Sequence, residues 1–144
     1  MENSSILQTA QRNKQNYLNA KTAYNKRDLD ACLAHYALDH QIMSAPLPPG
    51  REQIRKFFEE SFAMWPNIQI VVEHALAEDD WVMGRSVTTA THASTVMGVA
   101  PTQKTIKSTF WDLHRFTDEG LIVQTWNLRD NLTVMQQLGI ALPR

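Results

Sequence analysis

The sequence has 144 residues, of which 43% are hydrophobic and 20% charged, and its formal net charge is −1. This size predicts one globular domain over residues 1–144, and the near-neutral charge argues against a nucleic-acid partner or an anionic membrane surface, since both favour basic patches. The polar amino terminus lacks an apolar run of signal-peptide length, no stretch approaches the roughly 20 apolar residues that span a bilayer, and the one cysteine, Cys32, excludes an intrachain disulfide. We therefore expect a cytoplasmic protein.

The first part of the chain is expected to be mostly helical. Residues 4–26 contain no Gly or Pro and repeat apolar side chains at helical steps, which predicts one long helix. The residues of this stripe are Leu7, Ala10, Tyr17 and Tyr24. Asp28 is a suitable N-cap for a second, shorter helix over "LDACLAHYA", within which a buried, inert Cys32 thiol is expected. "HQIMSA" then predicts a short strand, and "PLPPG" a turn.

The segment "REQIRKFFEESFAMW" gives the clearest helical pattern. Its apolar side chains follow the i, i+3, i+4, i+8 spacing of a buried stripe. They are Ile54, Phe57, Phe58 and Phe62. Pro66 ends this helix.

Beyond Pro66 the apolar period changes from helical to alternating. "NIQIVVEHALAEDDWVMGRSVTTATHAS" predicts two long strands joined at "EDD". One face of this hairpin is expected to carry Ile68, Ile70, Val72 and Leu76. Two further strands, 104–117 and 121–129, turn at "TDEG", where Asp118 serves local geometry. A last helix is expected from Asp130 to Gly139.

The order of these elements is helix, helix, strand, helix, four strands in sequential hairpins, and helix. Such an order predicts an α+β fold in which a strongly curved antiparallel sheet wraps around N-terminal helices. A sheet curved in this way would enclose a concave, mostly apolar pocket.

Four stretches between residues 48 and 139 resemble the SnoaL-like polyketide cyclase (ester cyclase) family of the nuclear transport factor 2-like superfamily. They are "PPGREQIRKFFEESFAMWPNIQI", "DDWVMGRSVTTATHASTVMGVAPTQKTIK", "DLHRFTDEGLIVQTW" and "DNLTVMQQLG". The resemblance implies a cone-shaped α+β barrel and a homodimer that forms through the outer face of the sheet. It also implies cyclisation of a polyketide ester by intramolecular aldol condensation, with no metal or cofactor, using a pocket Asp as general acid/base and a nearby His.

In anthracycline cyclases of this family, the catalytic Asp lies on the last strand and its His partner on the strand before. Matching "QQLG" and the "DEG" turn puts the Asp position at Asn127 and the His position at Asp112. Both positions therefore depart from the family pattern. An Asn can donate or accept a hydrogen bond, but it cannot act as an acid or a base.

Strand alternation puts Phe110, Asp112, His114 and Phe116 on one face. A carboxylate on the wall of an apolar pocket would be desolvated, which would raise its pKa towards the value that a general base near neutral pH needs. We therefore predict that Asp112 is the acid/base group, oriented by His114, and that Asn127 binds a substrate oxygen. In the alternative interpretation, Asp112 is exposed or paired with Lys or Arg.

Phe110, Phe116, Met43 and His92 are the candidate substrate-binding residues. His92 could instead bond the backbone of a neighbouring strand. The histidine spacing does not match a metal-binding motif, so no metal site is expected. For Asp130, an N-cap role is favoured over a catalytic one.

Trp111 and Trp126 would lie on the opposite sheet face from Asp112 and Asn127. An apolar patch there usually marks an interface, which agrees with a homodimer. Two classes of function remain open. One is a cofactor-free cyclase, isomerase or dehydratase acting on a small apolar carbonyl compound; the other is a non-catalytic cone domain that binds a small ligand.

Overall fold

The computed structural model describes residues 2–141, with side chains described from Ser4. Along the chain the helices and strands are α1 (Glu2–Asn25), α2 (Leu29–Leu33), β1 (Tyr36–Ile42), α3 (Arg51–Met64), β2 (Gln69–Glu78), β3 (Trp81–Thr91), β4 (Thr105–Phe116), β5 (Ile122–Arg129) and α4 (Asn131–Gln137). Helices precede a run of sequential strands, so the predicted α+β class is confirmed.

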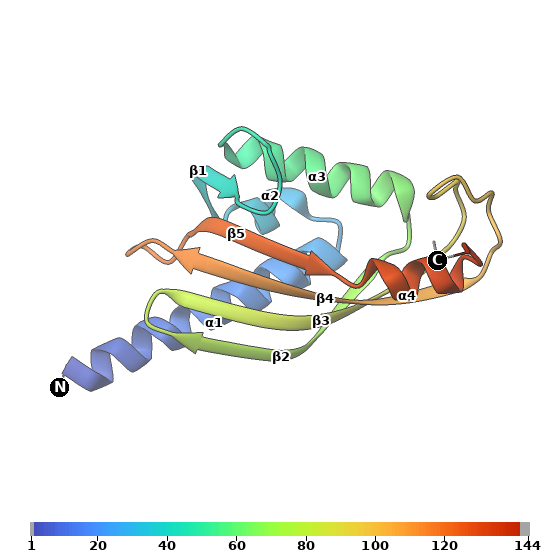
Figure 1. The fold of residues 1–144 in the computed structure, drawn as a ribbon. Helices are drawn as coiled ribbons and strands as arrows, with labels where there is room; N and C mark the ends of the chain where they lie inside the picture. Colours follow the sequence, from blue (N-terminus) through green and yellow to red (C-terminus); the bar gives the residue numbers. More distant parts are fainter. Residues whose placement is uncertain (1, 142–144) are drawn as a thin grey trace.

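The five strands form one curved sheet that does not close on itself, in the order β1-β5-β4-β3-β2 (Figure 1). The pairs from β2 to β5 are antiparallel, as predicted, whereas β1 pairs with β5 in parallel. On the inner side of the sheet, α1 packs against β2 and β3, and α3 packs against β1. This arrangement confirms the predicted cone-like fold with its N-terminal helices.

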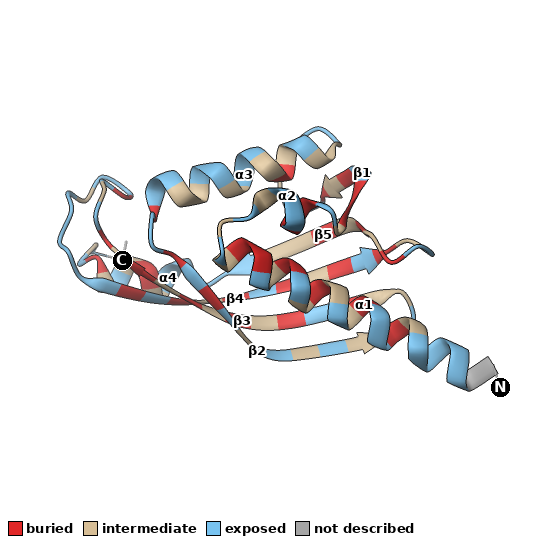
Figure 2. Cartoon of the chain, turned by 180° about the vertical axis from the view of Figure 1, so that it is seen from behind, coloured by how far each residue is buried: buried red, intermediate tan, exposed pale blue. Residues whose placement is uncertain are grey.

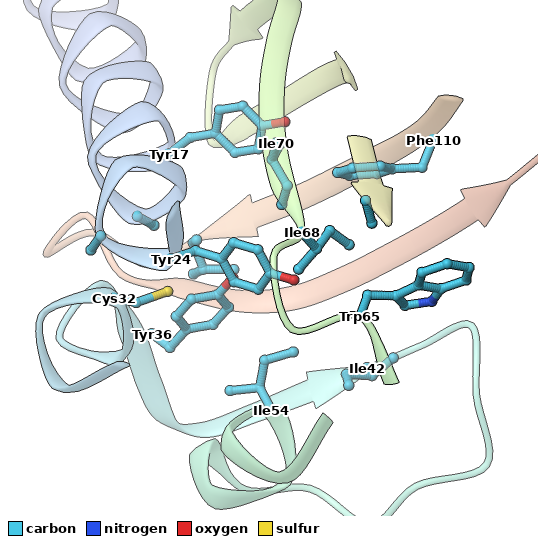
Figure 3. Close-up of a cluster of buried hydrophobic side chains, with 14 of the residues drawn as sticks. Tyr17, Tyr24, Cys32, Tyr36, Ile42, Ile54, Trp65, Ile68, Ile70 and Phe110 are labelled. Carbon is cyan, nitrogen blue, oxygen red and sulfur yellow. The ribbon is translucent and has the colours of Figure 1, made fainter. Parts of the chain in front are cut away.

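The inner side of the sheet holds the core, and along β3 and β4 buried positions alternate with half-buried or exposed ones (Figure 2). Figure 3 shows Tyr17 and Tyr24 extending from α1 into the interior, with Phe110 on the far side. The Tyr24 ring lies 5.1 Å from that of Phe58 and 4.7 Å from that of Phe62, both on α3. Aromatic contacts between α1 and α3 therefore hold the helical layer together over the sheet.

The first strand begins earlier than predicted. The second helix ends at Leu33, and β1 starts at Tyr36, four residues before the expected "HQIMSA" strand. The reason is the pairing with β5, in which Tyr36 lies opposite Ile122, and both side chains are buried. This tertiary pairing outweighs the weak helical pattern of "LDACLAHYA".

The prediction for Leu76 is wrong. A register shift between Val72 and His74 in β2 reverses the alternation that follows it. Leu76 therefore lies on the outer face, where its side chain is 71% exposed.

None of the described helices is long and apolar enough to cross a membrane.

Candidate functional site

A buried carboxylate, Asp112, lies at the centre of the inner sheet face. The alternation of β4 turns it inward together with Phe110 and His114, and all three are buried. In the neighbouring strands it lies opposite Gly84 of β3 and Asn127 of β5. The two positions that the sequence matched to catalytic residues are thus direct cross-strand neighbours.

Three side chains donate hydrogen bonds to the Asp112 carboxylate. The Tyr17 hydroxyl donates to Oδ1 at 2.7 Å. Lys21 Nζ donates to Oδ2 at 2.6 Å, and His114 Nε2 donates to the same oxygen at 3.0 Å. Two of these donors come from α1, so the packing of this helix on the sheet assembles the site.

The charge state of Asp112 differs from the sequence-based expectation. Burial by itself would raise the pKa of this carboxyl, but the Lys21 ammonium and the hydrogen bonds from His114 and Lys21 hold it below its ordinary value. The expected rise in pKa is therefore wrong. Asp112 is an ionised carboxylate, and the pairing with a Lys that the alternative interpretation foresaw occurs inside the protein rather than at its surface.

A chain of hydrogen bonds continues from His114 to Thr125 and His40. The Thr125 hydroxyl lies 2.8 Å from His114 Nδ1 and 2.7 Å from His40 Nε2. An ionised carboxylate can only accept, so neutral His114 carries its proton on Nε2 and its Nδ1 must accept from Thr125. The Thr125 oxygen is then left to accept from His40 Nε2. In this chain of hydrogen bonds, the neutral rings of His114 and His40 therefore both carry their proton on Nε2.

Both histidines of this chain are uncharged. Burial lowers the pKa of His40 to about 4, with a further contribution from His114. Burial also lowers the pKa of His114, although Asp112 opposes this effect. Because His40 Nδ1 has no hydrogen-bond partner within residues 2–141, a second proton there would be buried and unpaired.

Gly84 leaves the space that the Tyr17 hydroxyl occupies. A Cβ atom on Gly84 would lie 1.9 Å from Tyr17 Oη and 3.0 Å from Asp112 Oδ1. Any larger residue would therefore displace the tyrosine. Burial and the charge of Asp112 raise the pKa of Tyr17 well above its ordinary value, so its hydroxyl stays protonated and remains a donor.

A cavity of about 420 Å³ opens onto this network. Asp112, His114, Asn127 and Phe110 line it, so the structure brings together all three predicted catalytic residues and one predicted binding residue. Lys21 also lines the cavity, and most of its remaining wall is apolar and aromatic. A charged donor and a carboxylate on a mostly apolar wall suit a ligand that is largely hydrophobic and carries a polar group.

The other three predicted binding residues lie outside this cavity. His92 is buried in the loop after β3, with Nδ1 2.8 Å from the Thr102 hydroxyl and Nε2 donating to the Val99 carbonyl at 3.2 Å. Phe116 is buried in the core at the end of β4. Met43 is exposed, with its sulfur 3.8 Å from Gln124 Nε2. The structure therefore supports the structural alternative for His92.

Two residues that the sequence assigned to structural roles have them. Asp130 caps α4, because its carboxylate accepts hydrogen bonds from the Thr133 backbone N–H and hydroxyl. Cys32 is buried, and burial raises the pKa of its thiol to about 11, which makes it a poor nucleophile. Nowhere between residues 2 and 141 do three His, Cys, Asp or Glu side chains gather as a metal site would require.

Sequence reasoning missed Tyr17, Lys21 and Thr125. Lys21 follows Tyr17 by four residues and precedes Tyr24 by three, so it shares their helix face. A lysine within an apolar stripe was the signal that could have identified it. Thr125 could also have been predicted from the sequence, because it lies two residues before Asn127 and thus on the same strand face.

The outer face of the sheet has the opposite character. Trp111 is 45% exposed and Leu128 72% exposed, while Trp126 is half-buried with its ring 5.7 Å from that of Trp81. Met83, Leu76 and Val71 extend the exposed apolar surface across β3 and β2.

Comparison with known proteins gives one family and a set of similar structures. The model of the family described as SnoaL-like polyketide cyclase matches residues 14–138. AclR of Streptomyces galilaeus, provisionally described as a hydroxylase, is 28% identical with a TM-score of 0.81, covering 93% of this chain and 99% of its own. IdmH of Streptomyces antibioticus, provisionally described as a polyketide cyclase, is 29% identical with a TM-score of 0.78, covering 89% of this chain and 99% of its own.

A SnoaL-like polyketide cyclase of Agrobacterium tumefaciens is 18% identical, with a TM-score of 0.76 and coverage of 86% of this chain and 95% of its own. This likeness supports the fold. A search of curated proteins finds no match to the sequence.

Proposed function

Because the chain belongs to the SnoaL-like polyketide cyclase family, we propose that it is a cofactor-free enzyme that uses acid/base chemistry on a small apolar carbonyl compound. Intramolecular aldol cyclisation of a polyketide ester is the reaction that we favour. The observation that supports this proposal is an ionised carboxylate, Asp112, beside the Lys21 ammonium on the wall of a mostly apolar cavity.

In the proposed reaction, an Asp112 oxygen removes a proton from the carbon next to a substrate carbonyl. The electron pair of that C–H bond moves to the carbonyl oxygen and gives an enolate. The enolate carbon then attacks a second carbonyl of the same molecule and forms the ring C–C bond. The resulting alkoxide takes the proton back from Asp112, so the site returns to its starting state.

Lys21 stabilises the ionised form of Asp112, which makes this carboxylate a weak base while the two side chains are paired. The proposal therefore includes a movement of the Lys21 ammonium from Asp112 to the developing enolate oxygen when substrate enters. This movement would raise the basicity of Asp112 and bring positive charge to where negative charge develops. Asn127 would donate a second hydrogen bond to the same oxygen, and His114 would keep the carboxylate oriented.

The match of Asn127 to the position of the family's catalytic Asp is compatible with this scheme. Asp112 and Asn127 are cross-strand neighbours, so the carboxylate is shifted by one strand but still faces the same cavity. An isomerase or dehydratase would need the same proton abstraction. The specific observation that favours a non-catalytic binding domain is the ion pair itself, because an Asp112 that stays paired with Lys21 would be too weak a base to remove a proton from carbon.

Proton exchange tests the proposal without knowledge of the natural substrate. An aryl β-keto methyl ester in deuterated buffer should exchange its acidic C–H faster with the protein than without it. Asp112→Asn should reduce this acceleration about 10²–10⁴-fold, the usual worth of a positioned acid/base group. Asn127→Ala should cost about 1 kcal/mol, or roughly fivefold. Exchange that is equally fast in Asp112→Asn would exclude Asp112 as the base.

A homodimer through the outer sheet face is part of the proposal. Its support is the number of exposed apolar side chains on this face, Trp111 and Leu128 among them, since exposed apolar side chains that gather on one face usually mark an interface. The cytoplasmic location and the single domain over residues 1–144 stay predictions from the sequence.

A further inference from the structure

A second, smaller cavity adjoins the candidate site. Its volume is about 100 Å³, and its walls include Trp65, Val96 and Met97. Some residues line both cavities, and the two cavities are therefore adjacent. These shared residues are Ile68, Thr88, Arg129 and Asn131. The only charged one of the four is Arg129, at the end of β5.

The charges around the first cavity do not cancel. Lys21, Arg129 and Asp112 are the charged groups that line it, and His114 is neutral because burial lowers its pKa. Lys21 and Asp112 form an ion pair. Arg129 takes part in none of the ion pairs within residues 2–141. The cavity therefore carries a net charge of +1, located at the junction with the second cavity.

The position of Arg129 relates it to the reacting groups. Arg129 lies opposite Phe110 in the β4–β5 register, with its guanidinium 6.0 Å from the Phe110 ring centroid, and Asn127 precedes it by two residues on the same face. Two residues along a strand correspond to roughly 7 Å. A group held by Arg129 would therefore lie away from a carbonyl held by Asn127, and on the side of the second cavity.

We propose that Arg129 binds a carboxylate of the substrate and that an apolar end of the substrate enters the second cavity. A guanidinium matches a carboxylate with two parallel hydrogen bonds, and it binds more strongly next to apolar walls. The inference deepens the proposed function and rests on it, since it names the substrate class for the same cavity. The natural substrate would accordingly carry a free carboxylate in addition to the carbonyl and ester groups on which the proposed reaction acts.

A matched pair of probes tests this proposal by binding alone. 2-Naphthoate and methyl 2-naphthoate have the same ring system, and only the first is charged. Titration followed by NMR should show that the wild type binds the acid about tenfold or more tightly than the ester. Arg129→Gln should abolish this preference while leaving the affinity for the ester within about twofold, and Arg129→Lys should restore part of it. The matched control is Arg115→Gln on the outer face, which should keep the preference.

Several results would overturn the inference. They are equal affinity of the wild type for both probes, failure of both to bind, a preference for the acid that persists in Arg129→Gln, and an equal loss of both probes in that variant. Because binding requires no proton transfer, the outcome is independent of the exchange experiment on Asp112. An acid preference that depends on Arg129, together with no exchange activity, would identify an acid-binding domain.

Discussion

The two faces of strand β4 contrast sharply. On the inner face, Asp112 and His114 are buried and take part in a continuous hydrogen-bond network. On the outer face, Trp111 is substantially exposed although it is a large aromatic residue. Adjacent residues of one strand thus reverse the ordinary distribution, in which polar side chains meet water and apolar ones are buried.

The two faces need different partners: the inner face needs hydrogen-bond donors for its buried polar groups, and the outer face needs a surface that covers its apolar side chains. Buried polar groups are costly unless their hydrogen bonds are satisfied, and the donors from α1 satisfy those of Asp112. Exposed apolar groups gain stability only when another surface covers them. On the inner face, α1 of the same chain therefore supplies the partners of the buried carboxylate, whereas the outer face is the one that a second chain would cover.

Removal of the cation from the inner network should give the largest effect. Lys21→Met leaves the Asp112 carboxylate buried without its countercharge. Breaking one partner of a buried ion pair typically costs about 3–5 kcal/mol, and we expect a loss of this size in the free energy of unfolding, measured with urea.

Two further variants sharpen this test. Lys14→Met alters another lysine of α1 that forms none of the ion pairs found within residues 2–141, and should change the free energy of unfolding by less than about 0.5 kcal/mol. Lys21→Met combined with Asp112→Asn removes both charges and should regain much of the loss. If Lys21→Met is as stable as the wild type, the ion pair contributes little to the inner face.

A charge on the outer face should break the proposed dimer. Trp111→Glu would replace a large apolar side chain with a charged one at the contact, and we expect the dimer dissociation constant to rise about 100-fold, or about 3 kcal/mol. Analytical ultracentrifugation at micromolar concentration measures this change. Leu7→Glu, at an exposed position of α1, is the matched control and should stay dimeric. A monomeric wild type would mean that something other than a second copy covers this face.

The sequence was sufficient to predict the two faces of β4, because simple alternation decides them. It also predicted the helices and the hairpins, whose apolar periods are long and regular. The pairing of Lys21 with Asp112 was missed, because a lysine within the apolar stripe of α1 indicates a buried cation but does not show which carboxylate on another element it contacts. The exposure of Leu76 was missed for a related reason, since a bulge in β2 shifts the alternation without a sequence signal.

The inner network should also make stability depend on pH. The pKa of His40 is lowered to about 4 in the folded protein. Above its ordinary pKa the ring is neutral in both states and contributes nothing to pH dependence. As the pH falls towards 4, the unfolded chain binds a proton that the folded protein does not, so the free energy of unfolding should fall by about 3 kcal/mol. His114, whose pKa is also lowered, acts in the same direction.

Asp112 contributes in a different range. Its folded-state pKa is lowered, so its stabilisation is complete above its unfolded pKa and is lost only as the pH falls below that value. Urea unfolding between about pH 7 and about pH 4.5 therefore isolates the histidines. His40→Gln keeps a donor for Thr125 and should reduce the decline, whereas His74→Gln, at an exposed site, should leave it unchanged. An identical decline in His40→Gln would contradict this explanation.

The smallest effect should come from adding one methyl group to the inner face. In Gly84→Ala the new Cβ would lie 1.9 Å from the Tyr17 hydroxyl, so the tyrosine must move away from Asp112. Overpacking of this kind typically costs about 1–3 kcal/mol. Gly84→Ala and Tyr17→Phe both remove the same hydrogen bond to Asp112 Oδ1, so part of their effects is shared, and the double variant should be less destabilised than the sum of the two single variants. Urea unfolding of the four proteins measures this coupling. Additive losses would mean that Gly84 accommodates some other contact, and that the close approach of α1 to β3 is a matter of packing rather than of the carboxylate site.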